Sequence, residues 1–215
     1  TPTSGTTPTG GATPTGTAPS ATPTTPASTF AWPKPDRQAV ARVTTVDGVP
    51  RLSINGTRVP TVMFFGNTDI NARHFVIEEE FRKAGQNGVH LHSLISSPAL
   101  RSTEPPESRY FDLSVDLETA ITGDPDGFIL LRVNTGRYYN VAGYPEDERV
   151  QFVTTGQSYN PMVSIASDTW LDDAKAMLRD MVRYIRSHEL YSKHVIGYHL
   201  ECGEWFQYMF RENGL

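Results

Sequence analysis

Four runs of apolar residues are separated along this chain by segments with helical periodicity. The runs cover residues 61–65, 89–94, 128–133 and 195–200, and the helical segments between them cover residues 71–84, 113–121 and 168–187. Strands that are apolar almost throughout are typical of parallel sheets, whose strands are buried on both faces. Their alternation with helices predicts an α/β fold built on a parallel sheet.

Turn and capping residues mark the ends of the predicted elements. Asp47-Gly48 and Asn55-Gly56 are typical of type I′ turns and predict a small β-hairpin or meander before the first run. Ser167 can cap the helix over residues 168–187. The predicted buried stripe of that helix consists of Leu171, Ala174, Leu178, Met181, Val182 and Ile185.

Residues 1–35 have a composition unlike the rest of the chain. Thr, Pro, Gly, Ser and Ala dominate, and no charged residue precedes Lys34. Since so little apolar surface cannot offset the entropy of ordering, we predict a disordered linker that its prolines extend. Such tracts also occur as O-glycosylated stalks between secreted modules. We therefore expect a secreted or cell-surface protein, in which the linker joins a further module to a domain over residues 36–215.

Charge and cysteine content exclude several classes of protein. The formal net charge is −5 at pH 7 and no basic cluster occurs, so we expect neither nucleic acid nor a membrane as partner. No apolar run approaches the ~20 residues of a membrane span. Cys202 is the single cysteine, which excludes an intrachain disulfide and a cysteine-built zinc site. No cofactor is expected.

The four strands with their helices correspond to half of a (β/α)8 barrel. A flavodoxin-like sheet could be complete at this length, but the first strand lacks a glycine-rich phosphate loop. The connections after the later strands are long, which is typical of the carboxyl, active-site face of a barrel. We therefore predict a partial TIM barrel, comprising the first four βα units, preceded by the hairpin and the linker.

Polar residues inside two of the predicted strands are candidates for a site. His90 and His92 share one face of their strand, and His92 lies nearer the carboxyl end. His92 could contact substrate, or both could bind a metal with His199, or the imidazoles could simply fill a polar interior with hydrogen bonds. Arg132 is costly in an apolar strand unless it meets a carboxylate. It could orient a catalytic carboxylate or form a structural ion pair, and Asn134 follows it.

The fourth run ends in two carboxylates. Strand parity places Glu201 on the inward face with His199, and Ile196 on the side that faces the helices. Glu204 stands beyond the strand end, where Trp205 could supply the kind of apolar wall that raises a carboxyl pKa, as a general acid needs. The alternative is that both are surface loop glutamates.

Six motifs, spread between Val43 and Phe206, carry a family resemblance. They are Ile54-Asn55-Gly56 before Pro60, Met63-Phe64-Phe65, Asp126-Gly127-Phe128-Ile129-Leu130-Leu131-Arg132, Tyr144-Pro145-Glu146-Asp147-Glu148, Ser164-Ile165-Ala166-Ser167 with Trp170, and Val195-Ile196-Gly197-Tyr198-His199-Leu200 to Glu204-Trp205. Taken together, these motifs resemble clan A (β/α)8 glycoside hydrolases, in particular β-galactosidase-like proteins around glycoside hydrolase family 42.

The resemblance implies an enzyme that hydrolyses O-glycosidic bonds of an oligo- or polysaccharide with retention, using two carboxylates about 5–5.5 Å apart. It places the acid/base on Glu204. Many clan members have Asn before that glutamate, whereas Gly203 stands here, so Glu201 remains a candidate. The nucleophile would follow a seventh strand, so we expect the missing C-terminal half of the barrel to be needed for activity. The implied substrate-binding residues are His92, Arg132, Asn134, Glu201 and Trp205.

Two other functions remain open at this point. The first is a metal-dependent TIM-barrel hydrolase that uses His90, His92 and His199. The second is a non-catalytic carbohydrate-binding barrel that keeps aromatic residues but lacks the acid pair. Aromatic side chains could stack on the apolar C–H faces of sugars in either a catalytic or a binding site, or could simply pack within the loops. The candidates for such stacking are Tyr138, Tyr139 and Trp170.

Overall fold

The computed structural model describes residues 30–66, 73–134, 144–151, 158–164 and 166–201. The chain separates into two units between Ala31 and Trp32, and every element named below belongs to Trp32–Leu215. This unit has a mixed α/β fold with a four-stranded parallel sheet and a three-stranded antiparallel sheet. The expected α/β class is confirmed at this level. In the described part of the chain, no helix is both long and apolar enough to cross a membrane.

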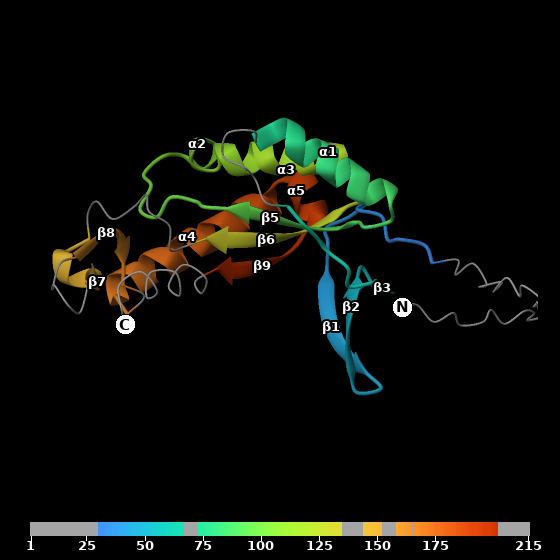
Figure 1. Ribbon diagram of the computed structural model, residues 1–215, viewed down its shortest axis with the longest axis horizontal. Coiled ribbons are helices and arrows are strands. Elements are labelled where there is room, and N and C mark those ends of the chain that lie inside the picture. The colour runs from blue at the N-terminus through green and yellow to red at the C-terminus, as the bar shows by residue number, and fades with distance from the viewer. Residues whose placement is uncertain (1–29, 67–72, 135–143, 152–157, 165, 202–215) are drawn as a thin grey trace, which may run out of the picture. The chain divides into compact units, whose positions relative to one another are not determined.

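The parallel sheet consists of β4 (Phe64–Phe65), β5 (Leu91–Ser96), β6 (Phe128–Asn134) and β9 (Val195–Glu201). Its order is β4-β5-β6-β9, so neighbours in the sheet are also successive strands of this sheet along the chain (Figure 1). The prediction of a fully buried strand over residues 61–65 is wrong. Only two of those residues form a strand, and Phe65 is 56% exposed. The strand is exposed because β4 stands at the end of the sheet order and, among the described strands, pairs only with β5.

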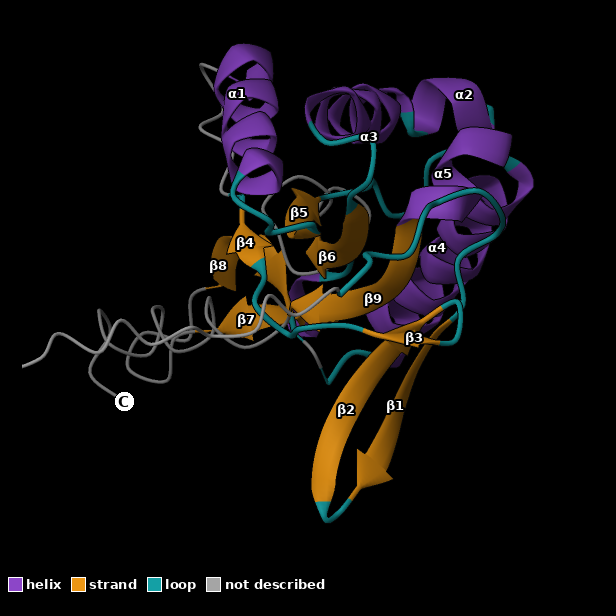
Figure 2. Cartoon of the chain, turned by 90° about the vertical axis from the view of Figure 1, so that its right-hand side faces the viewer, coloured by secondary structure: helices purple, strands orange, loops and turns teal. Residues whose placement is uncertain are grey.

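The helices of the described residues pack against one face of this sheet. They are α1 (Arg73–Gln86), α2 (Pro106–Arg109), α3 (Phe111–Gly123), α4 (Asp168–Ser187) and α5 (Glu189–His194). Figure 2 shows α1 and α3 on one side of β5 and β6, with α4 and α5 beside β9. One apolar core joins α1, α3, α4 and α5 to the strands of the sheet. The core includes Leu94, Ile129, Leu131 and Val133 from the strands and Phe81, Leu117, Met177 and Met181 from the helices.

Helix α4 has the predicted bounds and the predicted cap. The Ser167 hydroxyl accepts a hydrogen bond from the Trp170 amide at 3.0 Å, which satisfies one of the free N–H groups of the first turn. The predicted stripe is correct at Ala174, Met181 and Ile185, but Leu171 is 40% exposed. Trp170 and Met177 are buried instead. The burial of Trp170 contradicts its suggested role in stacking on sugars.

The antiparallel sheet is the predicted hairpin and meander: β1 (Ala41–Val46), β2 (Val49–Ile54) and β3 (Thr57–Arg58). Both turns are left-handed as expected, with φ of 50° at Asp47 and 52° at Asn55, each followed by a glycine of positive φ. At the base of the hairpin, Ile54 and Val59 pack against Leu91 and Phe128, the first residues of β5 and β6. The hairpin base therefore covers the amino edge of the parallel sheet.

A second antiparallel pair was not predicted from the sequence. It consists of β7 (Arg149–Gln151) and β8 (Ser158–Val163), preceded by a 3-10 turn over Glu146–Glu148. Glu148 accepts hydrogen bonds from the hydroxyls of Ser167 and Thr169, at the start of α4. The connection between β6 and α4 is thus tied to the first turn of that helix.

Candidate functional site at the carboxyl edge of the parallel sheet

Arg132 and Asn134 lie on the face of the sheet that the described helices leave uncovered. Alternate residues of β6 point to opposite faces, and Leu131 and Val133 belong to the core beneath the helices. Both polar residues are nevertheless buried, with Arg132 5% and Asn134 2% exposed. A cation and an amide near the carboxyl end of a parallel strand are placed where ligands of α/β proteins collect.

Arg132 is held by two groups from the end of β4. Its Nη2 donates to the carbonyl oxygen of Gly66 at 2.8 Å, and its guanidinium lies 3.6 Å from the centre of the Phe65 ring. Gly66 in turn donates its amide to the carbonyl of Ser93 on β5 at 3.0 Å. These contacts fix a positive charge between the ends of β4 and β6.

The sheet register brings Glu201 next to Asn134. In the pairing of β6 with β9, Arg132 is level with His199 and Asn134 is level with Glu201. Adjacent strands lie about 4.8 Å apart, so these residues occupy neighbouring positions at the carboxyl edge. Three of the predicted site residues are therefore brought together: Arg132, Asn134 and Glu201. Glu204 and Trp205 lie outside the described residues, as do Tyr138 and Tyr139.

His92 lies on the other face of the sheet. It is level with Ile129 of the helix-covered core, and its ring stands edge-on to Phe81 with centroids 4.6 Å apart. Its Nε2 donates to a carboxylate oxygen of Asp124 at 2.6 Å, and the side chain is 1% exposed. The ring therefore faces away from Arg132 and is enclosed, so we leave His92 out of the substrate site.

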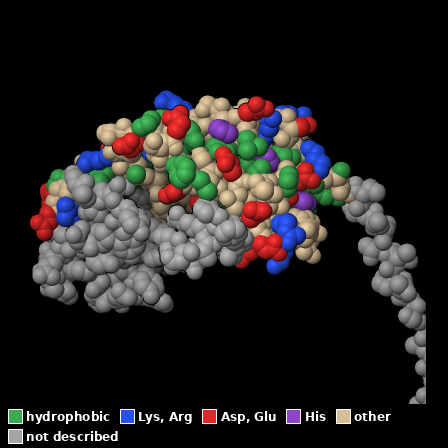
Figure 3. All heavy atoms as spheres, turned by 90° about the horizontal axis from the view of Figure 1, so that it is seen from above, with side chains coloured by type: hydrophobic (Ala, Val, Ile, Leu, Met, Phe, Trp, Pro, Cys, Tyr) green, Lys and Arg blue, Asp and Glu red, His purple; other side chains and the backbone are tan. Residues whose placement is uncertain are grey.

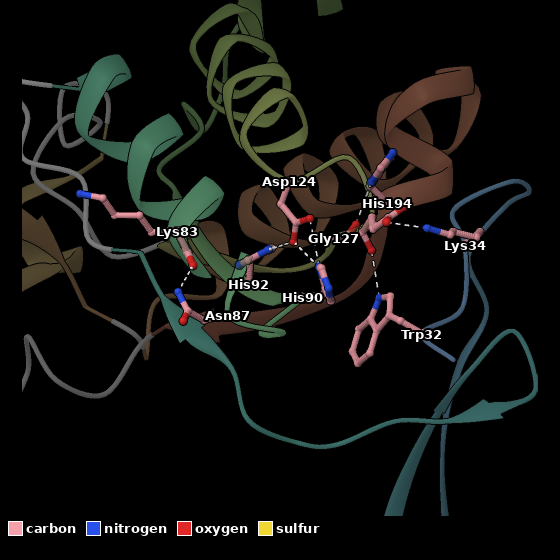
Figure 4. Close-up of polar contacts among 10 residues, drawn as sticks. Trp32, Lys34, Lys83, Asn87, His90, His92, Asp124, Gly127 and His194 are labelled. Carbon is pink, nitrogen blue, oxygen red and sulfur yellow. Dashed lines mark hydrogen bonds and ion pairs between the residues drawn. The ribbon is translucent and has the colours of Figure 1, made fainter. Parts of the chain in front are cut away.

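Asp124 is the centre of a polar cluster at the amino edge of the sheet (Figure 4). Besides His92, it accepts from Nδ1 of His90 at 2.9 Å, and the His90 ring packs against Trp32 with centroids 5.3 Å apart. Burial raises the pKa of Asp124, but the hydrogen bonds from His92 and His90 outweigh it and leave this pKa below its usual value. The carboxylate of Asp124 is thus charged and accepts hydrogen bonds from both histidines, so its role is structural.

Gly127 and His194 complete this cluster. A Cβ at Gly127 would lie 2.7 Å from Cδ2 of His92 and 2.9 Å from Oδ2 of Asp124, so no larger residue fits. His194, 4% exposed, donates through Nδ1 to the Gly127 carbonyl at 2.8 Å. Burial lowers the pKa of His194, which keeps the ring neutral. Asp124 was not among the site residues predicted from the sequence. The signal for its role was the pair of strand histidines, His90 and His92, which need a hydrogen-bond acceptor.

The structure separates His199 from the other two histidines of the metal alternative. His199 is exposed on β9 and level with Arg132, whereas His92 is level with Ile129. Three residues along β6 correspond to about 10 Å, and His90 and His92 are both bonded to Asp124. Within the described ranges, no three His, Cys, Asp or Glu side chains are grouped so as to hold a metal ion.

Two pockets among the described residues lie away from the carboxyl edge. One of about 310 Å³ lies among Ala39, Ala41, Ser192 and Tyr198, and one of about 430 Å³ lies among Arg101, Arg109, Asp173 and Arg183. Neither is lined by Arg132 or Asn134. Among the described residues on the face drawn in Figure 3, acidic and basic side chains are interspersed.

No protein-family model matches the chain. A search of curated proteins also gives no match.

Proposed function

We propose that this chain supplies the first four βα units of a (β/α)8 glycoside hydrolase that cleaves O-glycosidic bonds with retention. One observation carries the proposal: the strands follow one another in chain order with their helices on one face, and Arg132, Asn134 and Glu201 meet at the carboxyl edge of the other face. In a barrel this other face is the interior, and the carboxyl edge is the active-site end.

Strand order separates this proposal from a doubly wound sheet. In doubly wound folds the order reverses at a switch point, and helices cover both faces. Here β4, β5, β6 and β9 are sequential without reversal. A sheet that is wound in one direction and twists in the normal sense curls towards closure, and four further units of the same kind would complete it.

The proposed chemistry assigns distinct roles to the polar residues. Glu204 protonates the glycosidic oxygen and later activates water, and Trp205 provides its apolar wall. Arg132 and Asn134 position the carboxylates and sugar hydroxyls, since a guanidinium fixed by Gly66 and Phe65 presents its charge without rearrangement. Glu201, level with Asn134, binds substrate and is the alternative acid/base.

The decisive experiment compares Glu204→Ala with Glu201→Ala in the natural protein that contains the whole barrel. Loss of a retaining acid/base abolishes turnover of substrates with poor leaving groups but spares activated aryl glycosides, and added azide then restores rate and yields a glycosyl azide. We expect this pattern for Glu204→Ala and only weakened binding for Glu201→Ala. The reverse pattern would move the acid to Glu201. Binding of sugar without turnover by the wild-type protein would overturn the hydrolase in favour of a carbohydrate-binding barrel.

The predicted linker and export belong to the same proposal. A Thr- and Pro-rich segment over residues 1–35 would tether the barrel to another module outside the cell, where polysaccharide substrates occur. Intact-mass measurement of the natural protein tests the stalk form of this idea, because O-glycans would add mass within residues 1–35.

A further inference from the structure

Strand β1 has an outer edge to which no strand of the described residues pairs. The antiparallel sheet has the order β1-β2-β3, so β1 is an end strand. Figures 1 and 2 both show β1 and β2 projecting as an arm beyond the helices and the parallel sheet. An end strand that stands clear of the rest of the fold is a ready template for another strand.

The direction of the free backbone groups follows from the pairing inside the hairpin. The Asn55 amide donates to the Val40 carbonyl at 2.9 Å, so even-numbered residues of this strand bond to β2. The Ala39 amide points the other way, to the carbonyl of Ser192 at 2.9 Å. By alternation, the N–H and C=O groups of Val43 and Thr45 point outward from the sheet.

The residues along this edge favour pairing. β1 reads Ala-Arg-Val-Thr-Thr-Val, and its four β-branched residues are among the best strand formers. Apolar side chains on the arm remain in solvent: Val43 is 70%, Val46 40% and Val49 43% exposed. The strand lacks the proline and lysine that commonly protect an edge. A two-stranded hairpin alone is marginal in water, so a third strand would stabilise the arm.

We propose that two copies of this chain pair through β1 in antiparallel orientation, with Thr44 of each copy facing Thr44 of the other. In an antiparallel pair, the outward N–H and C=O groups of one strand must bond to the outward groups of the other. This requirement excludes every register that sets an odd-numbered residue opposite an even-numbered one. In the proposed register Val43 bonds with Thr45 of the second copy, and Arg42 lies beside Val46.

Charge selects this register over its neighbour. Centring the pair on Val43 would place the two Arg42 side chains diagonally, about 7–8 Å apart on one face, where like charges repel. Centring it on Thr44 separates them by four residues, or about 13 Å. The Thr–Thr pair on the axis is itself favourable. The result is a six-stranded sheet with the order β3-β2-β1-β1-β2-β3.

The proposed contact is small and leaves the carboxyl edge free. Each copy contributes one strand of six residues, well below the roughly 1,200 Å² that stable interfaces bury, so a reversible dimer is expected. The base of the arm packs on Leu91 and Phe128 at the amino edge, away from Arg132 and Asn134. Pairing through β1 does not require the proposed hydrolase activity, and that activity does not require the pairing.

A cysteine scan tests the register. Thr44→Cys, in a Cys202→Ser background, puts two thiols at a directly opposed non-hydrogen-bonded pair, close enough for a disulfide after a small adjustment. Arg42→Cys is the matched control, being on the same strand and face but about 13 Å from its counterpart. We expect Thr44→Cys to give a covalent dimer under mild oxidation at least tenfold faster than Arg42→Cys. Equal rates for the two variants would overturn the proposal.

A proline variant tests the pairing without a thiol. Thr45→Pro removes an outward N–H but no hydrogen bond of the hairpin, since Thr45 is opposite Pro50 in β2. Thr45→Val keeps the N–H and serves as its control. Sedimentation should show the wild type and Thr45→Val associating as concentration rises and Thr45→Pro staying monomeric, with the same thermal midpoint for all at low concentration. A wild type that stays monomeric up to millimolar concentration, or a Thr45→Pro that associates like it, would refute the dimer.

Discussion

Replacing Asp124 by Ala should destabilise the fold far more than replacing Asp126 in the same turn. Asp124 is the acceptor for His92, which is 1% exposed, and for His90. Without Asp124, the enclosed His92 N–H has no acceptor, which costs about 1–3 kcal/mol. The half-buried His90 also loses its hydrogen bond to the charged carboxylate. Together these effects predict a loss of roughly 2–4 kcal/mol in the free energy of unfolding.

Urea denaturation measures this loss directly. With an m-value of about 2 kcal/mol per molar urea, the midpoint should fall by roughly 1–2 M. Asp126→Ala removes only an exposed ion pair with Lys34 and leaves the backbone carbonyl that accepts from Trp32, so its effect should stay below about 1 kcal/mol. Asp124→Asn, which keeps one acceptor oxygen, should fall between them. Equal midpoints for the two alanine variants would show that the histidine–carboxylate cluster does not stabilise the sheet.

Two further predictions concern stability. Burial lowers the pKa of His194 below its ordinary 6.5, so the folded state binds fewer protons than the unfolded state. The contribution of the neutral imidazole to the free energy of unfolding is therefore complete above pH 6.5 and is lost as the pH falls through the folded-state pKa. His194→Gln should flatten this part of a plot of unfolding free energy against pH, and an unchanged slope would contradict the neutral buried imidazole. In α4, Met181→Ala should lower the free energy of unfolding by about 2–4 kcal/mol because Met181 is fully enclosed. Leu171→Ala, at a site 40% exposed, should lower it by under about 1 kcal/mol. Thermal denaturation measures both, and similar losses for the two variants would contradict the observed buried face of α4.

The parts of the fold that local chemistry determines could be predicted. Helix α4 begins after a capping serine, has a strong 3.6-residue period, and has the expected bounds. The turns at Asp47 and Asn55 were equally predictable, because few residue pairs tolerate two successive left-handed positions. In both cases the determining atoms lie within a few residues of each other.

Which face of a strand is covered could not be read from alternation. Parity correctly separates Arg132 from its neighbours, but it does not say on which side the helices lie, and His92 proved to be on the covered side. Its acceptor Asp124 is 32 residues away in sequence. The expectation that Ile196 faces the helices is also wrong. It packs with Leu91 and Phe128, because the register of β6 with β9 shifts between Ile129 and Leu130 and breaks the alternation.

The contacts of Trp32 determine where the chain can be truncated. Trp32 donates through Nε1 to the Asp126 carbonyl at 2.9 Å and packs on His90 and Phe128, and Lys34 pairs with the Asp126 carboxylate at 2.5 Å. A domain boundary placed at residue 36 from composition alone removes the contacts of Trp32 and Lys34. It also exposes the rings of His90 and Phe128, against which Trp32 packs. Recombinant versions should therefore start upstream of Trp32. A protease that removes the Thr- and Pro-rich segment should leave a stable fragment that still contains Trp32.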